Sequence, residues 1–331
     1  MTGVTPIFLL SSDRSGSNLL LRLVGSHKEI TAPPTSQLIS NLYKAISSYG
    51  DLDVQKSWDM LLRNASRLHK ASYGNWSNYA DLNALSDHKE NRSIHLILSR
   101  IFDTEGTSKS ASFIALKTHH AYNYAAQLQR DFPNARYIFL VRDPRDMALS
   151  WLKTAGLRGG IMRAAKIWKS DQEGFWQMSK QLGSQCHFIR YEDVLSDAAG
   201  TVSSLCEFIG LSYDPNMLNF HMNKDTQDIA GSVQAWNNLS HPLMHQNFKK
   251  YKTELSEDQR CYIEHCCQSG MEALGYKIEI YNSDCDIKAI SKKLEADEPW
   301  DKPAYANIPA DEKQNHVSLR EAIDKLLSAS A

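Results

Sequence analysis

Short apolar runs alternate with amphipathic stretches along residues 1–281. The pattern of buried strands occurs at residues 7–11, 112–120, 135–141 and 187–194. Helical spacing occurs at residues 19–24, 121–130 and 144–151, in an amphipathic stretch that ends near Gly210, and at residues 257–276, which Gly275 ends. Strands that alternate with helices predict an α/β fold, with a mostly parallel sheet and helices on both faces.

The switch from the third predicted strand to its helix carries clear start signals. Asp143 suits the N-cap and Pro144 the first helical position, and Asp146 stands three residues on, where a capping box would place an acid.

All four predicted strands end in side chains suited to chemistry. The terminal groups are Arg14, Lys117 with His119, Arg142, and Tyr191 with Glu192. Ligands of parallel α/β sheets bind beyond the carboxyl ends of the strands. We therefore expect these groups to converge on one site.

Two regions depart from the alternating pattern. Residues 37–100 are predicted as a helical insertion whose aromatic residues either pack over the sheet or line a pocket: Tyr43, Tyr49, Trp58, Tyr73, Trp76 and Tyr79. Residues 282–331 are rich in charge and proline and are predicted as a linker or extended tail.

A short helix is predicted at the end of this tail, at residues 318–329, with Ser318 and Glu321 in capping-box spacing. The helix has one apolar stripe, made of Leu319, Ile323, Leu326 and Leu327. This stripe docks either on the body of the chain or on a partner subunit, and the second alternative would make a homo-oligomer.

Composition excludes several classes of function. The 37 Lys and Arg residues nearly balance the 38 Asp and Glu residues, so no overall field favours nucleic acid or an anionic membrane. No apolar run reaches the roughly 18–20 residues of a membrane span, and no signal pattern opens the chain, so a cytoplasmic protein is expected. The six cysteines have no zinc-binding spacing and are expected as free thiols, without a metal.

The stretch from residue 14 to residue 18 has the composition of an anion-binding turn. A helix N-terminus binds phosphate through its unpaired N–H groups and its dipole. Gly16 permits a tight turn, Ser15, Ser17 and Asn18 add donors, and Arg14 adds a charge. The G-x-x-x-x-G-K-[ST] pattern of nucleoside triphosphatases is absent.

A second anion site is predicted at the third strand end. Arg142 closes that strand, and Ser150 lies eight residues on, about two helical turns away. Two anion sites on neighbouring strand ends suit a nucleotide that is phosphorylated at two positions.

Five segments, in order, resemble the sulfotransferase family, in its bacterial type. "SSDRSGSN" resembles the loop that binds the 5′-phosphosulfate, and "LVRDPRDMALSW" the segment that binds the 3′-phosphate, of 3′-phosphoadenosine 5′-phosphosulfate (PAPS). "ALKTHHA" is similar to the motif that holds the general base, and "IRYEDVLSD" to the segment near the adenine. "NFKKYKTELSEDQ" followed by "MEALGY" resembles the closing C-terminal pattern.

The resemblance implies a P-loop-like sulfotransferase domain over residues 1–281, which moves a sulfuryl group from PAPS to a hydroxyl of a small molecule, carbohydrate or lipid and releases adenosine 3′,5′-bisphosphate (PAP). It implies catalytic roles for His119 as base, Lys117 and Arg14. The implied nucleotide-binding residues are Arg14, Ser15, Gly16, Ser17, Asn18, Arg142, Ser150, Tyr191, Lys249 and Lys250. The loops at 156–160 and 227–246, with the insertion, are expected to shape the acceptor pocket.

Several alternatives stay open at this point. His120 or His245 could replace His119 as base, Arg142 could pair with Glu192 or Asp193, and Tyr191 could be core packing. Arg14 stands where cytosolic members have lysine, Asn18 where threonine is frequent, and Thr35 and Ser36 where many bacterial members have glutamate. The alternatives for the whole protein are a kinase-like phosphotransferase and a non-catalytic nucleotide-binding homologue.

Overall fold

A computed structural model describes residues 3–71, 74, 76–282, 285–298 and 300–328. Its centre is a five-stranded sheet in the order β2-β3-β1-β4-β5, in which every neighbouring pair is parallel. The strands are β1 (Thr5–Ser11), β2 (Ile30–Thr31), β3 (Phe113–Lys117), β4 (Arg136–Val141) and β5 (Cys186–Arg190). β1 lies between β3 and β4, with Ile7 opposite both Ala115 and Arg136.

Helices make up most of the remaining chain. The α-helices are α1 (Ser17–Gly25), α2 (Leu38–Ala45), α3 (Gln55–Lys70), α4 (Ile94–Lys109), α5 (Ala125–Asp131), α6 (Pro144–Lys153), α7 (Ile161–Leu182), α8 (Tyr191–Ser196), α9 (Ala198–Ile209), α10 (Lys224–Ala230), α11 (Tyr251–Glu254), α12 (Glu257–Ala273), α13 (Ile287–Asp297) and α14 (Ala310–Leu327). Short 3₁₀ turns are η1 (Ile46–Tyr49), η2 (Asn83–Leu85), η3 (Ala121–Tyr124), η4 (Gly183–Gln185), η5 (Pro215–Met222), η6 (Gln234–Ser240) and η7 (Pro303–Asn307).

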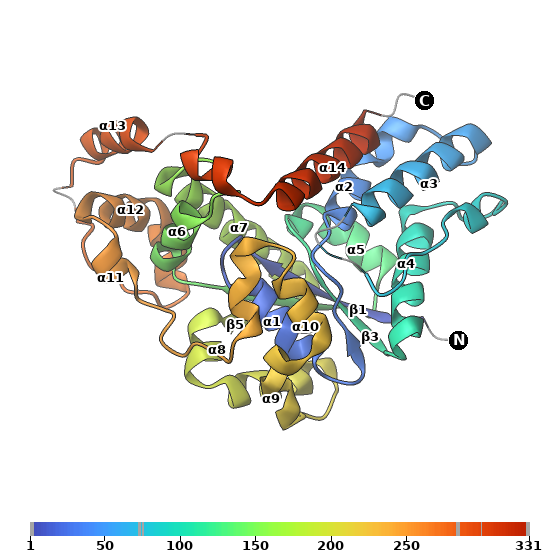
Figure 1. Ribbon diagram of the computed structural model, residues 1–331, viewed down its shortest axis with the longest axis horizontal. Helices are drawn as coiled ribbons and strands as arrows, with labels where there is room; N and C mark the ends of the chain where they lie inside the picture. Colours follow the sequence, from blue (N-terminus) through green and yellow to red (C-terminus); the bar gives the residue numbers. More distant parts are fainter. Residues whose placement is uncertain (1–2, 72–73, 75, 283–284, 299, 329–331) are drawn as a thin grey trace.

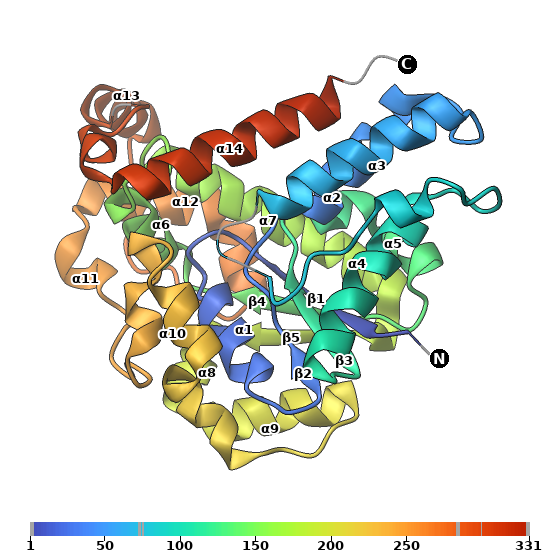
Figure 2. The same ribbon diagram turned by 45° about the vertical axis from the view of Figure 1, so that its right-hand side comes forward.

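The central strand β1 is apolar on both faces, as a strand covered on both sides must be. Phe8 and Leu10 point into a core shared with α2, α3, α4 and α7. Ile7 and Leu9 point the other way, into a core shared with α1, α9 and η5. Figures 1 and 2 show helices α1, α4, α7 and α9 around the sheet. The predicted α/β class, with a parallel sheet and helices on both faces, is confirmed.

A third core joins α6, α7 and α12, and a buried ion cluster ties it together. Arg145 pairs with Asp143 at 2.8 Å and with Glu264 at 2.6 Å, and all three side chains are less than a tenth exposed. Glu264 also accepts the backbone N–H groups of residues 279–281. This cluster fixes the start of α6, the helix that follows β4.

Two local predictions around this region were wrong. The strand predicted at 187–194 ends at Arg190, and Tyr191 begins α8, because Glu192 and Asp193 favour a helical first turn. Asp143 is the N-cap of α6, but Asp146 does not complete a capping box. Its carboxylate instead accepts the backbone N–H groups of Lys249 and Tyr251.

The aromatic residues of the insertion pack over the sheet. Tyr43, Tyr49, Trp58 and Trp76 are buried in the core that contains Phe8. Tyr79 is partly buried against the same core, and Tyr73 lies outside the described residues.

The tail prediction was wrong in its main point. Residues 287–297 form α13, and the last helix begins at Ala310, eight residues before the predicted N-cap Ser318. Proline suits the first turn of a helix, and here Pro303 opens η7 and Pro309 precedes α14. Leu319 and Leu326 are buried against α2 and α3, so the apolar stripe docks on the chain's own body (Figure 1).

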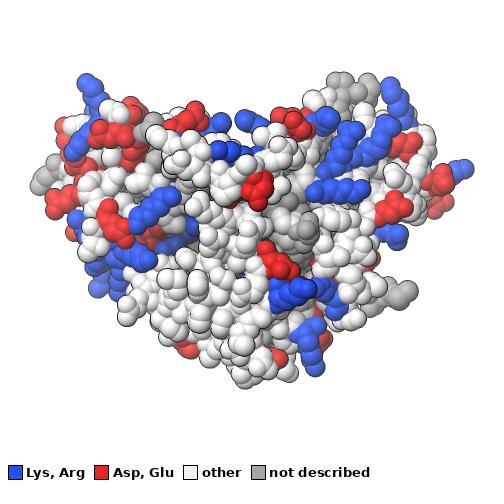
Figure 3. Space-filling view, viewed as in Figure 1, with Lys and Arg blue, Asp and Glu red and all other residues white. Residues whose placement is uncertain are grey.

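Surface features add little to this picture. Among the described residues, none of the helices has the length and hydropathy to cross a bilayer. On the face seen in Figure 3, acidic and basic side chains are intermixed. All six cysteines are free thiols.

Candidate active site

A cavity of about 790 Å³ opens beyond the carboxyl ends of β1, β3 and β4. The loop after β1, the end of β3, the β4–α6 junction and the first residue of α8 all contribute to its lining. The predicted residues that line it are Arg14, Gly16, Ser17, Asn18, Lys117, His119, Arg142, Ser150, Tyr191 and Lys250. The strand ends therefore converge as expected.

The turn before α1 requires glycine for two independent reasons. Gly16 has φ +92°, in the left-handed region, and a Cβ there would lie 2.3 Å from the Tyr191 ring. The turn thus brings the Gly16 backbone against Tyr191, and α1 begins at the next residue, where its first amide N–H groups have no partner within the helix. Ser15 is buried beside it, and its hydroxyl has no hydrogen-bond partner among the described residues.

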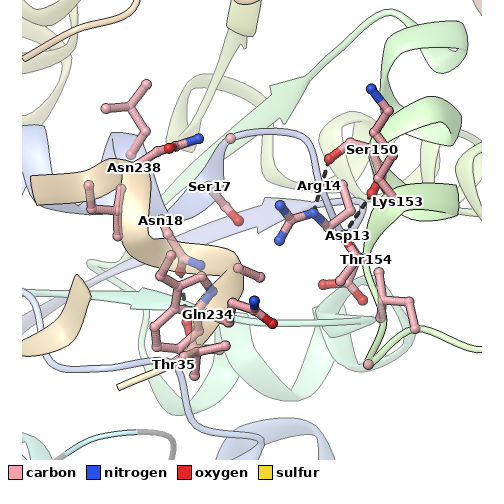
Figure 4. Close-up of a pocket in the computed structure, with 18 of the residues that line it drawn as sticks. Asp13, Arg14, Ser17, Asn18, Thr35, Ser150, Lys153, Thr154, Gln234 and Asn238 are labelled. Carbon is pink, nitrogen blue, oxygen red and sulfur yellow. Dashed lines mark hydrogen bonds between the residues drawn. The ribbon is translucent and has the colours of Figure 1, made fainter. Parts of the chain in front are cut away.

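Two arginines come together where the predicted anion sites meet. Arg14 Nε donates to Ser150 Oγ at 3.2 Å (Figure 4). Arg142 Nη1 donates to the Arg14 carbonyl at 3.0 Å. Arg142 also donates to the Asn247 carbonyl at 3.3 Å, and its guanidinium lies 4.4 Å from the centre of the Tyr191 ring. The two predicted sites form one continuous cationic wall.

This wall has a surplus of positive charge. Burial lowers the pKa of the Arg14 guanidinium, Asp13 raises it, and the neighbouring Arg142 lowers it further. Among the described residues, the Arg142 guanidinium donates to the carbonyls of Arg14 and Asn247 rather than to Glu192 or Asp193, and its Nε has no partner there. Glu192 accepts the backbone N–H of Asp143 and the hydroxyl of Tyr276 instead. An anion bound here would relieve the repulsion between the two arginines.

A carboxylate, an amine and an imidazole cluster beside the arginines. Asp13 Oδ1 lies 3.2 Å from Lys117 Nζ and 3.7 Å from His119 Nε2. Burial raises the pKa of Asp13, but His119 and Lys117 outweigh it and hold that pKa well below its usual range. Burial, with the Lys117 charge, lowers the pKa of His119 to about 4, so its ring is neutral at neutral pH.

The other candidate bases lie elsewhere. His120 borders a smaller neighbouring cavity of about 320 Å³, and its ring contacts Tyr122 at 3.0 Å and Asp171 at 3.5 Å. His245 Nδ1 contacts the Leu195 carbonyl at 2.6 Å. Of these three histidines, His119 is the one that lines the large cavity.

Not every predicted residue lines the cavity. Lys250 does, but Lys249 points toward Phe248, with its ammonium 5.3 Å from that ring, and its backbone N–H is taken by Asp146. Asn18 is held by the Thr35 hydroxyl, which donates to its amide oxygen at 3.1 Å.

Sequence reasoning missed part of the lining. Asp13 lies inside the quoted loop motif, but nothing in the sequence shows that it meets Lys117, 104 positions away. The predicted loops at 156–160 and 227–246 do contribute, while the insertion contributes Gln37. The tail adds Ala304, Asn307, Ile308, Glu312 and His316, a region that proline and charge had marked as linker.

Comparison with known proteins gives the same family from two directions. A sequence profile of the sulfotransferase family matches residues 6–215. Carbohydrate sulfotransferase 2 of Mus musculus is 28% identical over 170 residues, which cover 46% of this chain and 31% of that protein. Protein-tyrosine sulfotransferase 2 of Gallus gallus is 20% identical over 219 residues, covering 64% of this chain and 53% of that protein. The chain thus spans less than a third of the first relative and about half of the second.

Among solved structures, the sulfotransferase domain from the curacin biosynthetic pathway superimposes with a TM-score of 0.57 at 22% identity, covering 83% of this chain and 99% of that domain. The sulfotransferase domain from the Synechococcus PCC 7002 olefin synthase gives the same TM-score at 19% identity, covering 84% and 98%. These likenesses establish the fold.

Proposed function

This chain belongs to the sulfotransferase family, and we propose that it transfers the sulfuryl group of PAPS to a hydroxyl of a small molecule or carbohydrate. The observation that carries the proposal is the junction of the two anion sites. Arg14, Arg142 and Ser150 meet at one cavity wall, in a cavity large enough for a nucleotide.

The residues present fit PAPS. The Ser15 hydroxyl and Arg142 Nε are buried without partners among the described residues, and the missing Cβ at Gly16 lets this turn pack directly against Tyr191, which lines the same cavity. Arg14 and the amides of residues 15–18 would hold the 5′-phosphosulfate. Arg142 and Ser150 would hold the 3′-phosphate, and Tyr191 and Lys250 would border the nucleoside.

PAPS, when bound, supplies an activated sulfuryl group and a phosphate leaving group. The protein has to position the two reactants, stabilise the negative charge and remove a proton from the acceptor. The neutral His119 ring keeps one nitrogen with a free lone pair that can accept the proton of an acceptor hydroxyl. The Asp13 carboxylate lies between Lys117 and His119 and offsets the positive charge of Lys117 beside the base. Lys117 and Arg14 can stabilise negative charge on peripheral oxygens.

The acceptor class rests on the relatives and on the lining. By their names, one of these relatives acts on carbohydrate and another on protein tyrosine, and both substrates carry a hydroxyl. The cavity lining includes Trp236 and the amides of Gln37, Gln234 and Asn238. An aromatic ring and amides together can contact the face and the hydroxyls of a small polar acceptor.

The test measures binding and transfer separately. We expect the purified chain to bind PAP and not to bind ATP with magnesium. We also expect it to transfer a sulfuryl group from PAPS to at least one member of a hydroxyl-compound library, which the mass increase of the product detects. Binding of ATP with magnesium in preference to PAP would favour a kinase-like enzyme. PAP binding without transfer to any hydroxyl would leave a non-catalytic nucleotide-binding protein.

A further inference from the structure

Residues 300–327, here called the C-terminal strap, are fixed at their first end to the helices around Ser150. The Trp300 carbonyl accepts the backbone N–H of Gly159 at 2.8 Å. The Lys302 ammonium donates to the carbonyls of Trp151 and Thr154, at 2.5 and 3.0 Å, where α6 ends. The strap therefore starts on the helix that carries Ser150.

The other end of the strap is fixed to the helical insertion. Leu319, Ala322 and Leu326 are buried in the core with α2 and α3. The Tyr49 hydroxyl donates to the Leu326 carbonyl at 3.1 Å, and the Asn64 amide donates to the Lys325 carbonyl at 3.3 Å. Figure 2 shows α14 running from the side of α13 to the side of α3. The strap spans the cavity between two fixed ends.

Between these ends the strap contributes a carboxylate to the cavity. Glu312 is only 6% exposed, and its Oε2 accepts the backbone N–H of Gln234 at 2.9 Å. Its Oε1 lies 3.9 Å from His316 Nε2, beyond hydrogen-bond distance. A carboxylate has about four acceptor sites, so Glu312 keeps capacity for a further donor.

Glu312 differs from the other acids of the lining in its partners. Three acids line the described cavity: Asp13, Asp146 and Glu312. Asp13 pairs with the Lys117 ammonium, and Asp146 receives two backbone N–H groups on its two oxygens. Glu312 pairs with neither a lysine nor an arginine among the described residues, and its Oε1 can accept a hydrogen bond from a ligand.

The partner of Glu312 lies on the side of the cavity away from Ser150. Figure 4 places Gln234, its partner, with Asn18 and Thr35 on one side of the cavity, and Ser150 and Lys153 on the other. A Cβ on Gly74 would lie within 4 Å of both Pro34 and Ser232, so the 232–234 loop adjoins the 34–35 loop. The Ser40 hydroxyl, a few residues on, donates to the His119 carbonyl.

We propose that the C-terminal strap forms the acceptor wall of the cavity, and that Glu312 is a specificity-determining residue that accepts a hydrogen bond from a second donor on the acceptor. The inference rests on the proposed function. The acceptor then carries, besides the hydroxyl presented to His119, another hydroxyl or an ammonium group. The anionic nucleotide is disfavoured at this wall, since it would meet a buried carboxylate.

The test compares Glu312→Gln with Glu321→Gln, a matched change at an exposed position of the same helix. The glutamine oxygen at 312 can still accept the Gln234 N–H, so the strap stays in place, which thermal melting checks. Binding to the PAP-loaded full chain is measured by saturation-transfer NMR for glucosamine and N-acetylglucosamine, which have several donors, and for 4-nitrophenol, which has one hydroxyl.

The expected result is that at least one amino sugar binds the wild type and Glu321→Gln alike, and binds Glu312→Gln about tenfold or more weakly, because a hydrogen bond to a charged group is lost. Binding of 4-nitrophenol and of PAP stays the same in all three proteins. Absence of amino-sugar binding to the wild-type complex, or equal binding to Glu312→Gln, would overturn the proposal. Failure of all three proteins to bind PAP would instead overturn the proposed function on which it depends.

Discussion

Removal of the Arg142 side chain tests the nucleotide site most directly. Arg142 is 7% exposed and is held by two carbonyls, those of Arg14 and Asn247, and by the face of Tyr191. This preorganised guanidinium carries the proposed contact with the 3′-phosphate. We expect Arg142→Ala to weaken PAP binding selectively.

The magnitude follows from the contacts available. A hydrogen bond to a charged group contributes about 1.5–3 kcal/mol, and a guanidinium can make two to a phosphate. Ser150 and Arg14 stay in place and recover part of the loss, since both line the same wall. A net loss of about 2–4 kcal/mol is therefore expected, which is about 30- to 700-fold in Kd.

The assay is calorimetric titration of PAP and of 5′-AMP, which lacks the 3′-phosphate, into the wild type and Arg142→Ala. The loss is expected for PAP, and 5′-AMP should bind both proteins within about twofold. Arg142→Lys should give an intermediate loss, because it keeps the charge without the planar fork. Arg130→Ala, at an exposed arginine, is the control. An equal loss for PAP and 5′-AMP would show that Arg142 does not contact the 3′-phosphate.

Three further results are expected. His119→Ala should abolish turnover while PAP still binds, and near-normal turnover of this variant would exclude His119 as the base. The kcat of the wild type should be constant near neutral pH and fall as the pH drops through about 4, where the His119 ring becomes protonated. Gly16→Ala should lower the free energy of unfolding, measured by urea titration, by more than Gly210→Ala. Both glycines have φ +92°, so alanine costs each about 1–2 kcal/mol of backbone strain, but only the Cβ at position 16 also meets the Tyr191 ring. Equal losses would show that the Tyr191 contact has no role. Glu264→Ala should lower the free energy of unfolding by about 3–5 kcal/mol in the same titration, since Arg145 loses a buried partner. A loss below about 1 kcal/mol would contradict the importance of this ion pair.

The sheet and its chemical edge could be predicted from the sequence because both depend on short-range patterns. Apolar runs that end in Arg14, Lys117 or Arg142 identify strands and their carboxyl ends, and parallel pairing brings those ends together. The sequence alone predicts a tight turn at Gly16. The second requirement for glycine there, the close approach of the Tyr191 ring, involves a residue far along the chain and could be seen only in the structure.

Pairings across the sheet could not be predicted in the same way. Asp146 has the spacing of a capping box, but the 249–251 loop offers its carboxylate two backbone donors. The N-cap of α6 receives its reciprocal acid from Glu192, on α8, because β5 lies beside β4. Local spacing identifies which residues can cap a helix, while tertiary neighbours decide which of them do.

In the strap, a high proline content does not indicate a linker, because the prolines stand where helical turns begin. Pro303 and Pro309 break no helix, because each stands where a helical turn begins and an amide N–H is not needed. Helices in proteins gain most of their stability from packing of an apolar face, and the apolar stripe of α14 packs on α2 and α3. The insertion and the tail, which the sequence presents as separate departures from the α/β pattern, therefore stabilise each other, and their contact carries Glu312 across the cavity.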